Sequence, residues 1–70
     1  MTYESVLSFV EQCINYASRD PEYAMTYETQ AFGAVSFVCQ QVWQSDPELE
    51  RKLAEMWNDE WRNLFTQLYL

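Results

Sequence analysis

The chain has 70 residues, of which 49% are hydrophobic and 17% aromatic, and its formal net charge is −7 with no histidine. A chain of this length suffices for one domain, residues 1–70, and its large aromatic side chains can fill a core without a metal or a disulfide. Lysine and arginine together number 4, which is too few for direct binding to nucleic acid or to an anionic membrane surface. The composition therefore favours a folded acidic protein whose partner is another protein.

Two short motifs with the same sequence divide the chain into three segments. They are Asp20-Pro21-Glu22 and Asp46-Pro47-Glu48. In each motif the aspartate suits the N-cap of a helix, the proline suits the first turn, and the glutamate suits the positive end of the helix dipole. The sequence therefore predicts an all-α protein, a small three-helix bundle of up-down-up topology, because short connections favour antiparallel neighbours.

The first predicted helix covers residues 3–18 and has Thr2 as its N-cap. Its apolar residues recur at the spacing of one helical face and leave the polar residues on the other side. That face comprises Tyr3, Val6, Leu7, Val10, Cys13, Ile14 and Ala17, widened on one flank by Phe9 and Tyr16. An apolar arc of this width predicts packing against two neighbouring helices.

The second segment allows two interpretations upstream of Ala31. One helical face between residues 31 and 43 carries Ala31, Phe32, Val35, Val38, Cys39, Val42 and Trp43. Extended toward Pro21, the same face would include Glu28. Either a short extra helical turn after Pro21 precedes a break and a new helix capped by Thr26, or one continuous helix buries part of Glu28. We favour the break, because Glu28 then lies in a first helical turn, where a carboxylate is stabilised.

The third predicted helix covers about residues 47–67. Its apolar face comprises Leu49, Leu53, Met56, Trp57, Trp61, Leu64 and Leu68, with Ala54 and Phe65 at one edge. We expect Trp57 and Trp61 to be core residues. The spacing also suits two ion pairs along the helix, Glu48 with Lys52 and Asp59 with Arg62.

Glu60 falls within the apolar face of the third helix and is a candidate buried carboxylate, like Glu28. A functional interpretation is an acid or base with a raised pKa, or a group that reaches a ligand. The structural interpretation is a glutamate at the edge of the bundle, hydrogen-bonded to a tyrosine, a tryptophan or an arginine, with its stem packed and its carboxylate in water. We favour the structural interpretation for both residues, because helix faces often carry one such satisfied polar side chain.

No residue pattern supports catalysis or cofactor binding. Cys13 and Cys39 have no histidine to activate them, both fall on core faces, and their places along antiparallel helices do not suit a disulfide. The single glycine, Gly33, excludes a phosphate-binding loop of the usual kind, and without histidine the ligands for a metal are too few. We expect no enzyme activity, no metal, no cofactor and no small-molecule ligand.

The chain carries no pattern of a targeting or membrane segment. Its first residues lack the basic start and apolar run of a signal peptide. The longest stretch without a polar side chain, residues 31–35, is far shorter than a membrane span. Together with two cysteines expected to be free, this favours a cytoplasmic location and no contact with a membrane.

The candidate interaction site lies on the second helix. Phe37 points nearly opposite to the core face there, near Gly33, Gln41 and Gln44. An aromatic residue beside a glycine that permits close approach of a second backbone is typical of a site for self-association or for a partner. The alternatives are that neighbouring helices cover Phe37, or that it is an isolated exposed aromatic residue.

Two functional hypotheses follow. The first is a non-enzymatic protein-interaction or regulatory module that forms a homodimer through the second helix. The second is an acidic inhibitor, or nucleic-acid mimic, that blocks a basic surface of a nucleic-acid-processing protein, and it rests on the charge of −7. Arg51, Lys52 and Arg62 interleave with the carboxylates of the third segment, which weakens the second hypothesis.

Overall fold

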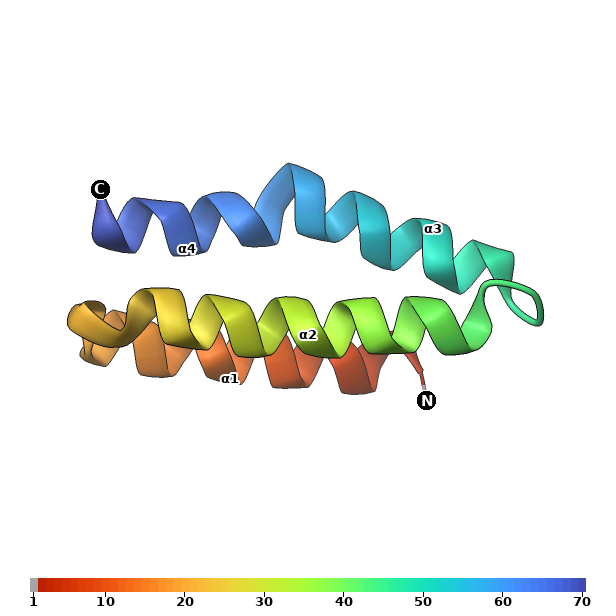
Figure 1. Ribbon diagram of the computed structural model, residues 1–70, viewed down its shortest axis with the longest axis horizontal. Helices are drawn as coiled ribbons and strands as arrows, with labels where there is room; N and C mark the ends of the chain where they lie inside the picture. The colour runs from red at the N-terminus through yellow and green to blue at the C-terminus, as the bar shows by residue number, and fades with distance from the viewer. Residues whose placement is uncertain (1) are drawn as a thin grey trace.

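The computed structural model describes residues 2–70, and every regular element in that range is helical. The elements are α1 (Tyr3–Arg19), η1 (Pro21–Tyr23), α2 (Ala24–Val42), α3 (Pro47–Met56), η2 (Trp57–Trp61) and α4 (Arg62–Tyr69). Because α3, η2 and α4 follow one another without a break, they form a single third helix. The three helices run back and forth along the longest axis of a body that measures 37 × 18 × 16 Å (Figure 1). The predicted up-down-up three-helix bundle is confirmed.

Helix α1 begins where the sequence predicts, at the N-cap Thr2. The Ser5 amide donates to Thr2 Oγ1 at 3.2 Å and the Thr2 amide donates to Ser5 Oγ at 3.2 Å, which is a capping box. The centre of the predicted apolar face is buried, namely Val6, Val10, Cys13 and Ala17. The flanking residues Phe9 and Tyr16 are 40% and 43% exposed. The bundle therefore uses only the middle of the wide apolar arc of α1.

The start of the second helix differs in part from the prediction. The short extra helical turn exists as η1, a 3-10 turn in which the Tyr23 amide donates to the Asp20 carbonyl at 2.9 Å. However, α2 follows η1 directly at Ala24, so the predicted break and the N-cap at Thr26 are wrong. Asp20 makes no side-chain cap either. Ala24 is completely buried. Tertiary packing of this residue stabilises the first turn of α2, which therefore forms without a side-chain cap.

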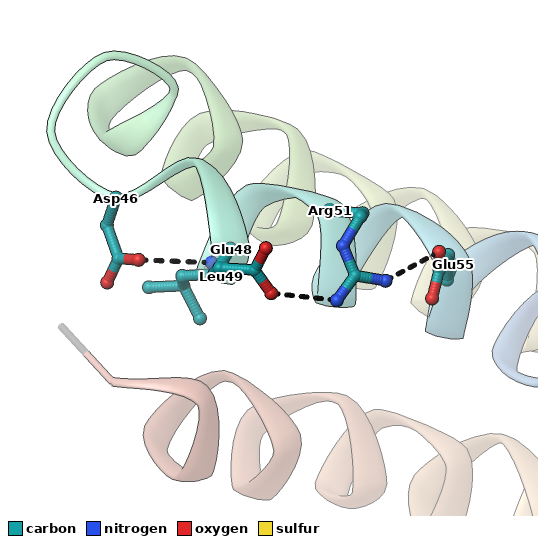
Figure 2. Close-up of polar contacts among 5 residues, drawn as sticks. All are labelled: Asp46, Glu48, Leu49, Arg51 and Glu55. Atoms are coloured by element: carbon teal, nitrogen blue, oxygen red, sulfur yellow. Dashed lines mark hydrogen bonds and ion pairs between the residues drawn. The ribbon is translucent and has the colours of Figure 1, made fainter.

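The start of α3 follows the prediction closely. Asp46 caps the helix, since its side chain accepts a hydrogen bond from the Leu49 amide at 3.2 Å (Figure 2). The predicted partner of Glu48 is wrong: Glu48 pairs with Arg51 at 2.8 Å, and Arg51 also pairs with Glu55 at 2.9 Å. Lys52 turns to α1 instead.

Lys52 links α3 to α1 through an aromatic ring. Its Nζ lies 3.9 Å from the centroid of the Tyr3 ring, in a cation–π contact. The predicted pair of Asp59 with Arg62 is not among the ion pairs that residues 2–70 form. Arg51 is therefore the basic residue that pairs with carboxylates on its own helix, whereas Lys52 contacts an aromatic ring of another helix.

A π-helical turn, η2, changes the face that the third helix presents to the core. The Arg62 amide donates to the Trp57 carbonyl, five residues earlier. The buried residues recur every four positions, at Leu49, Leu53, Trp57, Trp61 and Phe65. In a regular α-helix each such step drifts by about 40°, so the five residues would spread over about 160°. One extra residue in η2 sets the register back by about 100° and keeps them on one side.

This register shift corrects the predicted face beyond Trp61. Phe65, expected at the edge, is completely buried, whereas Leu64, expected in the core, is 37% exposed. Trp57 and Trp61 are buried as predicted, and the Trp57 ring centroid lies 6.2 Å from that of Phe65. On the second helix the prediction also fails for Phe32 and Trp43, which are 50% and 57% exposed. Both lie at the edge of the α2 apolar arc, where the third helix covers them only in part.

Candidate functional site

Helix α2 occupies the middle of the bundle and leaves one side uncovered. It packs against α1 on one flank and against α3 and α4 on the other (Figure 1). Its core side carries Ala24, Ala31, Val35 and Val38, all buried. The α2 outer face, on the opposite side, consists of the exposed residues Thr26, Gln30, Gly33, Phe37, Gln40 and Gln41. No helix of residues 2–70 packs over this face.

Phe37 projects from the α2 outer face over a groove shared with α1. Its side chain is 53% exposed, so the alternative in which neighbouring helices cover it is wrong. The groove has a volume of about 350 Å³ and is lined by Ser5, Val6, Phe9, Ala34, Phe37 and Val38. Serine is the one polar residue among these, so the groove offers apolar contact with two partly exposed phenylalanines at its rim.

The α2 outer face carries no charge, although the protein as a whole is strongly acidic. Glu28 is the one charged residue of α2, and residues 29–45 contain no aspartate, glutamate, lysine or arginine. A surface without charge does not repel a second copy of an acidic protein, and it offers nothing with which a basic surface could pair. Glutamine and threonine side chains at the same time provide hydrogen-bond donors and acceptors around Phe37.

Gly33 makes the centre of this face flat. A Cβ atom placed on Gly33 would meet no other atom within 4 Å, and the backbone there has an ordinary helical φ. Neither internal packing nor backbone geometry therefore requires glycine at this position. Glycine in a helix lowers the free energy of unfolding by about 1 kcal/mol relative to alanine, and no contact within the monomer offsets this loss. A close approach of another chain would explain it.

The structure brings the predicted interaction residues together on one side. Gly33, Phe37 and Gln41 are exposed on α2, and Gln44 is exposed in the turn that follows. Sequence reasoning missed Phe9 of α1, which lines the groove together with Phe37. Phe9 lies at the edge of the apolar arc of α1, and that position is the only signal that could have suggested its partial exposure.

Glu28 is half-buried between α2 and the end of the third helix, where it accepts a hydrogen bond. The hydroxyl group of Tyr69 donates to Glu28 Oε1 at 3.0 Å. The bond is the satisfied arrangement that the structural interpretation predicts for this carboxylate. Glu28 is thus a partner in helix packing, on the core side of α2 rather than on its outer face.

Glu60 is not buried: it lies at the edge of the bundle, where the structural interpretation places it, and not in the interior that the acid–base interpretation requires. Its side chain is exposed at the rim of a shallow groove between α1 and the third helix, which Glu11 also lines. The cause is η2, in which Glu60 lies, because the extra residue of the π turn rotates Glu60 away from the core. Without burial, Glu60 lacks the environment on which the acid–base interpretation depends.

Both cysteines are free thiols. Burial raises the pKa of the Cys13 thiol, and burial together with the nearby carboxylate of Glu50 raises the pKa of Cys39. The Cys39 thiol lies 3.8 Å from the Glu50 carbonyl oxygen, to which it donates. A raised pKa keeps a thiol protonated and therefore poorly nucleophilic at neutral pH.

Residues 2–70 bring no three cysteine, aspartate or glutamate side chains together in an arrangement that could hold a metal ion. Within the same range, each helix is too short or too polar to cross a lipid bilayer. Comparison of the chain with protein-family models, with curated proteins and with solved structures finds no significant match. The α2 outer face and its groove are the surface features of residues 2–70 that best suit a binding partner.

Proposed function

We propose that this protein is a non-enzymatic protein-interaction module that self-associates through the α2 outer face, as a cytoplasmic homodimer with a regulatory role. The observation that supports it best is a half-exposed phenylalanine on an uncharged helix side, in a protein with a net charge of −7. Exposed aromatic residues that fill a groove of a partner are the usual anchors of protein interfaces. The two free thiols fit a reducing compartment.

The interface in this proposal is dominated by apolar contact, which sets its salt dependence. Screening weakens attraction between opposite charges, but it also weakens the repulsion between two acidic copies. Association through the α2 outer face should therefore persist, or become slightly tighter, as the salt concentration rises. An interface with a basic partner would behave in the opposite way.

The test is the solution mass by size-exclusion chromatography with light scattering, over about a hundredfold range of concentration and at low and high salt. We expect a monomer of 8.4 kDa to convert to a dimer with rising concentration at both salt levels. Phe37→Ser should suppress the dimer. Tyr23→Ser is the matched control, because Tyr23 is 52% exposed against 53% for Phe37 but lies in η1. A monomer under all conditions would refute self-association.

A second candidate function, the acidic inhibitor of a basic protein surface, is supported by a different observation. Both ion pairs formed by residues 2–70 use Arg51, which leaves the exposed carboxylates of Glu4 and Glu11 on α1 outside any ion pair. A lysine-rich peptide should then bind the protein tightly at low salt and lose most of its affinity at about 0.3 M salt. Unchanged binding of this peptide by Glu4→Gln/Glu11→Gln would argue against this candidate.

A further inference from the structure

We propose that the partner at the α2 outer face is a second copy of the chain in antiparallel orientation, with a two-fold axis at the level of Val35, so that Phe37 of each copy packs onto Gly33 of the other. This inference rests on the proposed function, because it takes the α2 outer face to be the interface. It adds the orientation and the register of the two copies, neither of which the proposed function requires.

The spacing of exposed residues on α2 is the first argument. Positions 26, 30, 33, 37 and 40 are all exposed and are separated alternately by four and three residues. Alternation of this kind is the seam of a helix pair, in which every third and fourth residue faces the partner helix. The seam here is mostly polar, with glutamine and threonine side chains, and its apolar contact is concentrated at Phe37. Such a seam predicts a pairing of modest strength. Its register depends on the two residues at the centre of the seam, Gly33 and Phe37.

The identity of the two central seam residues determines the orientation. In an antiparallel pair, residues equally far before and after the axis residue lie side by side, so an axis at Val35 places Phe37 beside Gly33 and Gln40 beside Gln30. The large ring then occupies the space left by the missing Cβ, twice in one symmetric interface. A parallel pair would instead place Phe37 against Phe37 and leave a gap where the two Gly33 residues meet.

The shape and charge of the protein also fit a second copy. The three helices run along the 37 Å axis of a body 18 Å wide, so an antiparallel pair lays two long faces against each other. The whole outline of 37 × 18 Å is smaller than the roughly 800 Å² per partner that a standard interface buries, which agrees with a pairing of modest strength. The absence of charged residues between positions 29 and 45 removes repulsion at the contact itself.

The test uses two double variants that carry the same net charge as the natural chain, Gln30→Lys/Gln40→Glu and Gln30→Glu/Gln40→Lys. Both positions are exposed, and lysine and glutamate suit a helix as well as glutamine does, so both variants should fold. Residues ten apart on one helix are about 15 Å distant, so the new charges cannot pair within one copy. In the antiparallel dimer each lysine lies beside a glutamate of the other copy. In a parallel dimer like charges would meet.

Sedimentation equilibrium at low salt should give dissociation constants about three- to fivefold lower than that of the natural chain for both variants, because two exposed ion pairs form. The gain should disappear at about 0.5 M salt. A dimer that depends on Phe37 but that both variants leave unchanged or weaken overturns the antiparallel register and leaves the proposed function standing. If the natural chain and the two double variants are all monomers, both the antiparallel register and the proposed self-association are overturned.

Discussion

The hydroxyl group of Tyr69 donates a hydrogen bond to Oε1 of Glu28 at 3.0 Å, across 41 residues of sequence. It joins the last turn of α4 to α2, and it is the only side-chain hydrogen bond in residues 2–70 that links α2 to the end of the chain. Most other side-chain bonds connect residues three or four positions apart. The bundle therefore depends mainly on apolar packing along its length, and this solvent-exposed hydrogen bond adds a polar contact between α2 and the end of the chain.

Removal of this hydrogen bond should cost stability without a change of shape. Tyr69→Phe deletes only the hydroxyl group and leaves the half-buried Glu28 without its partner, which should lower the free energy of unfolding by about 1 kcal/mol. Urea unfolding followed by circular dichroism measures this difference. Tyr23→Phe is the control, because the Tyr23 side chain makes no hydrogen bond within residues 2–70. An equal loss in both variants would contradict the role of the bond.

The π turn predicts that alanine substitutions at two adjacent positions, Leu64 and Phe65, lower the free energy of unfolding by unequal amounts. Leu64→Ala should cost less than about 1 kcal/mol because Leu64 is 37% exposed, whereas Phe65→Ala should cost about 3–5 kcal/mol because Phe65 is completely buried. A loss of that size can unfold a domain this small, so Phe65→Leu, which leaves a smaller cavity and should cost about 2 kcal/mol, serves as the milder variant. Urea unfolding should rank Leu64→Ala as the less damaging change. The reverse ranking would mean that the third helix is a regular α-helix.

Gly33→Ala should separate the stability of the monomer from that of the dimer. A Cβ at Gly33 meets open space within the monomer, so alanine should raise the free energy of unfolding by about 1 kcal/mol through its helix propensity. The same methyl group would occupy the place where the Phe37 ring of the partner packs. Thermal unfolding at low concentration should therefore show a higher Tm, while sedimentation shows weaker association. Tighter or unchanged association would indicate that Gly33 is not at the contact.

Burial of Cys13 predicts a loss of stability at alkaline pH. Burial raises the pKa of its thiol in the folded protein above the ordinary value of 9.0. The unfolded chain therefore loses this proton first, and the stabilisation present below pH 9.0 disappears as the pH rises toward the folded pKa. Urea unfolding between about pH 8 and 10 should show a steeper decline for the natural chain than for Cys13→Ala. Parallel declines would show that Cys13 does not contribute.

Much of this fold can be predicted from the sequence because its helix boundaries are local features. Thr2 and Asp46 act as caps through side-chain contacts with residues three positions away, and such contacts depend on nothing else in the chain. The buried centre of α1 follows from helical periodicity in the same way. Asp20 has nearly the same backbone angles as Asp46 but makes no side-chain cap, so the Asp-Pro-Glu motif does not by itself produce the cap.

The features that escape prediction depend on the neighbouring helices. Phe65 joins Trp57 and Trp61 in the core only because η2 inserts one residue, whereas hydrophobic periodicity assumes a constant turn and places Leu64 there instead. Regular periodicity puts Glu60 on the apolar face for the same reason. Likewise, the exposure of Phe37 could be anticipated from its angle on the helix, whereas the contribution of Phe9 to the groove depends on how α1 lies beside α2.

The central claim, that the α2 outer face is an interface, is tested most directly by a dilution series of ¹⁵N–¹H correlation spectra over about a hundredfold range of concentration. The amide signals of Gln30, Gly33, Phe37 and Gln40 should shift with concentration, while those of the exposed α3 residues Glu48, Arg51 and Glu55 stay in place. These α3 residues are a suitable internal reference because they are exposed and pair with one another (Figure 2). Spectra independent of concentration, or shifts confined to α3 and α4, would contradict the claim.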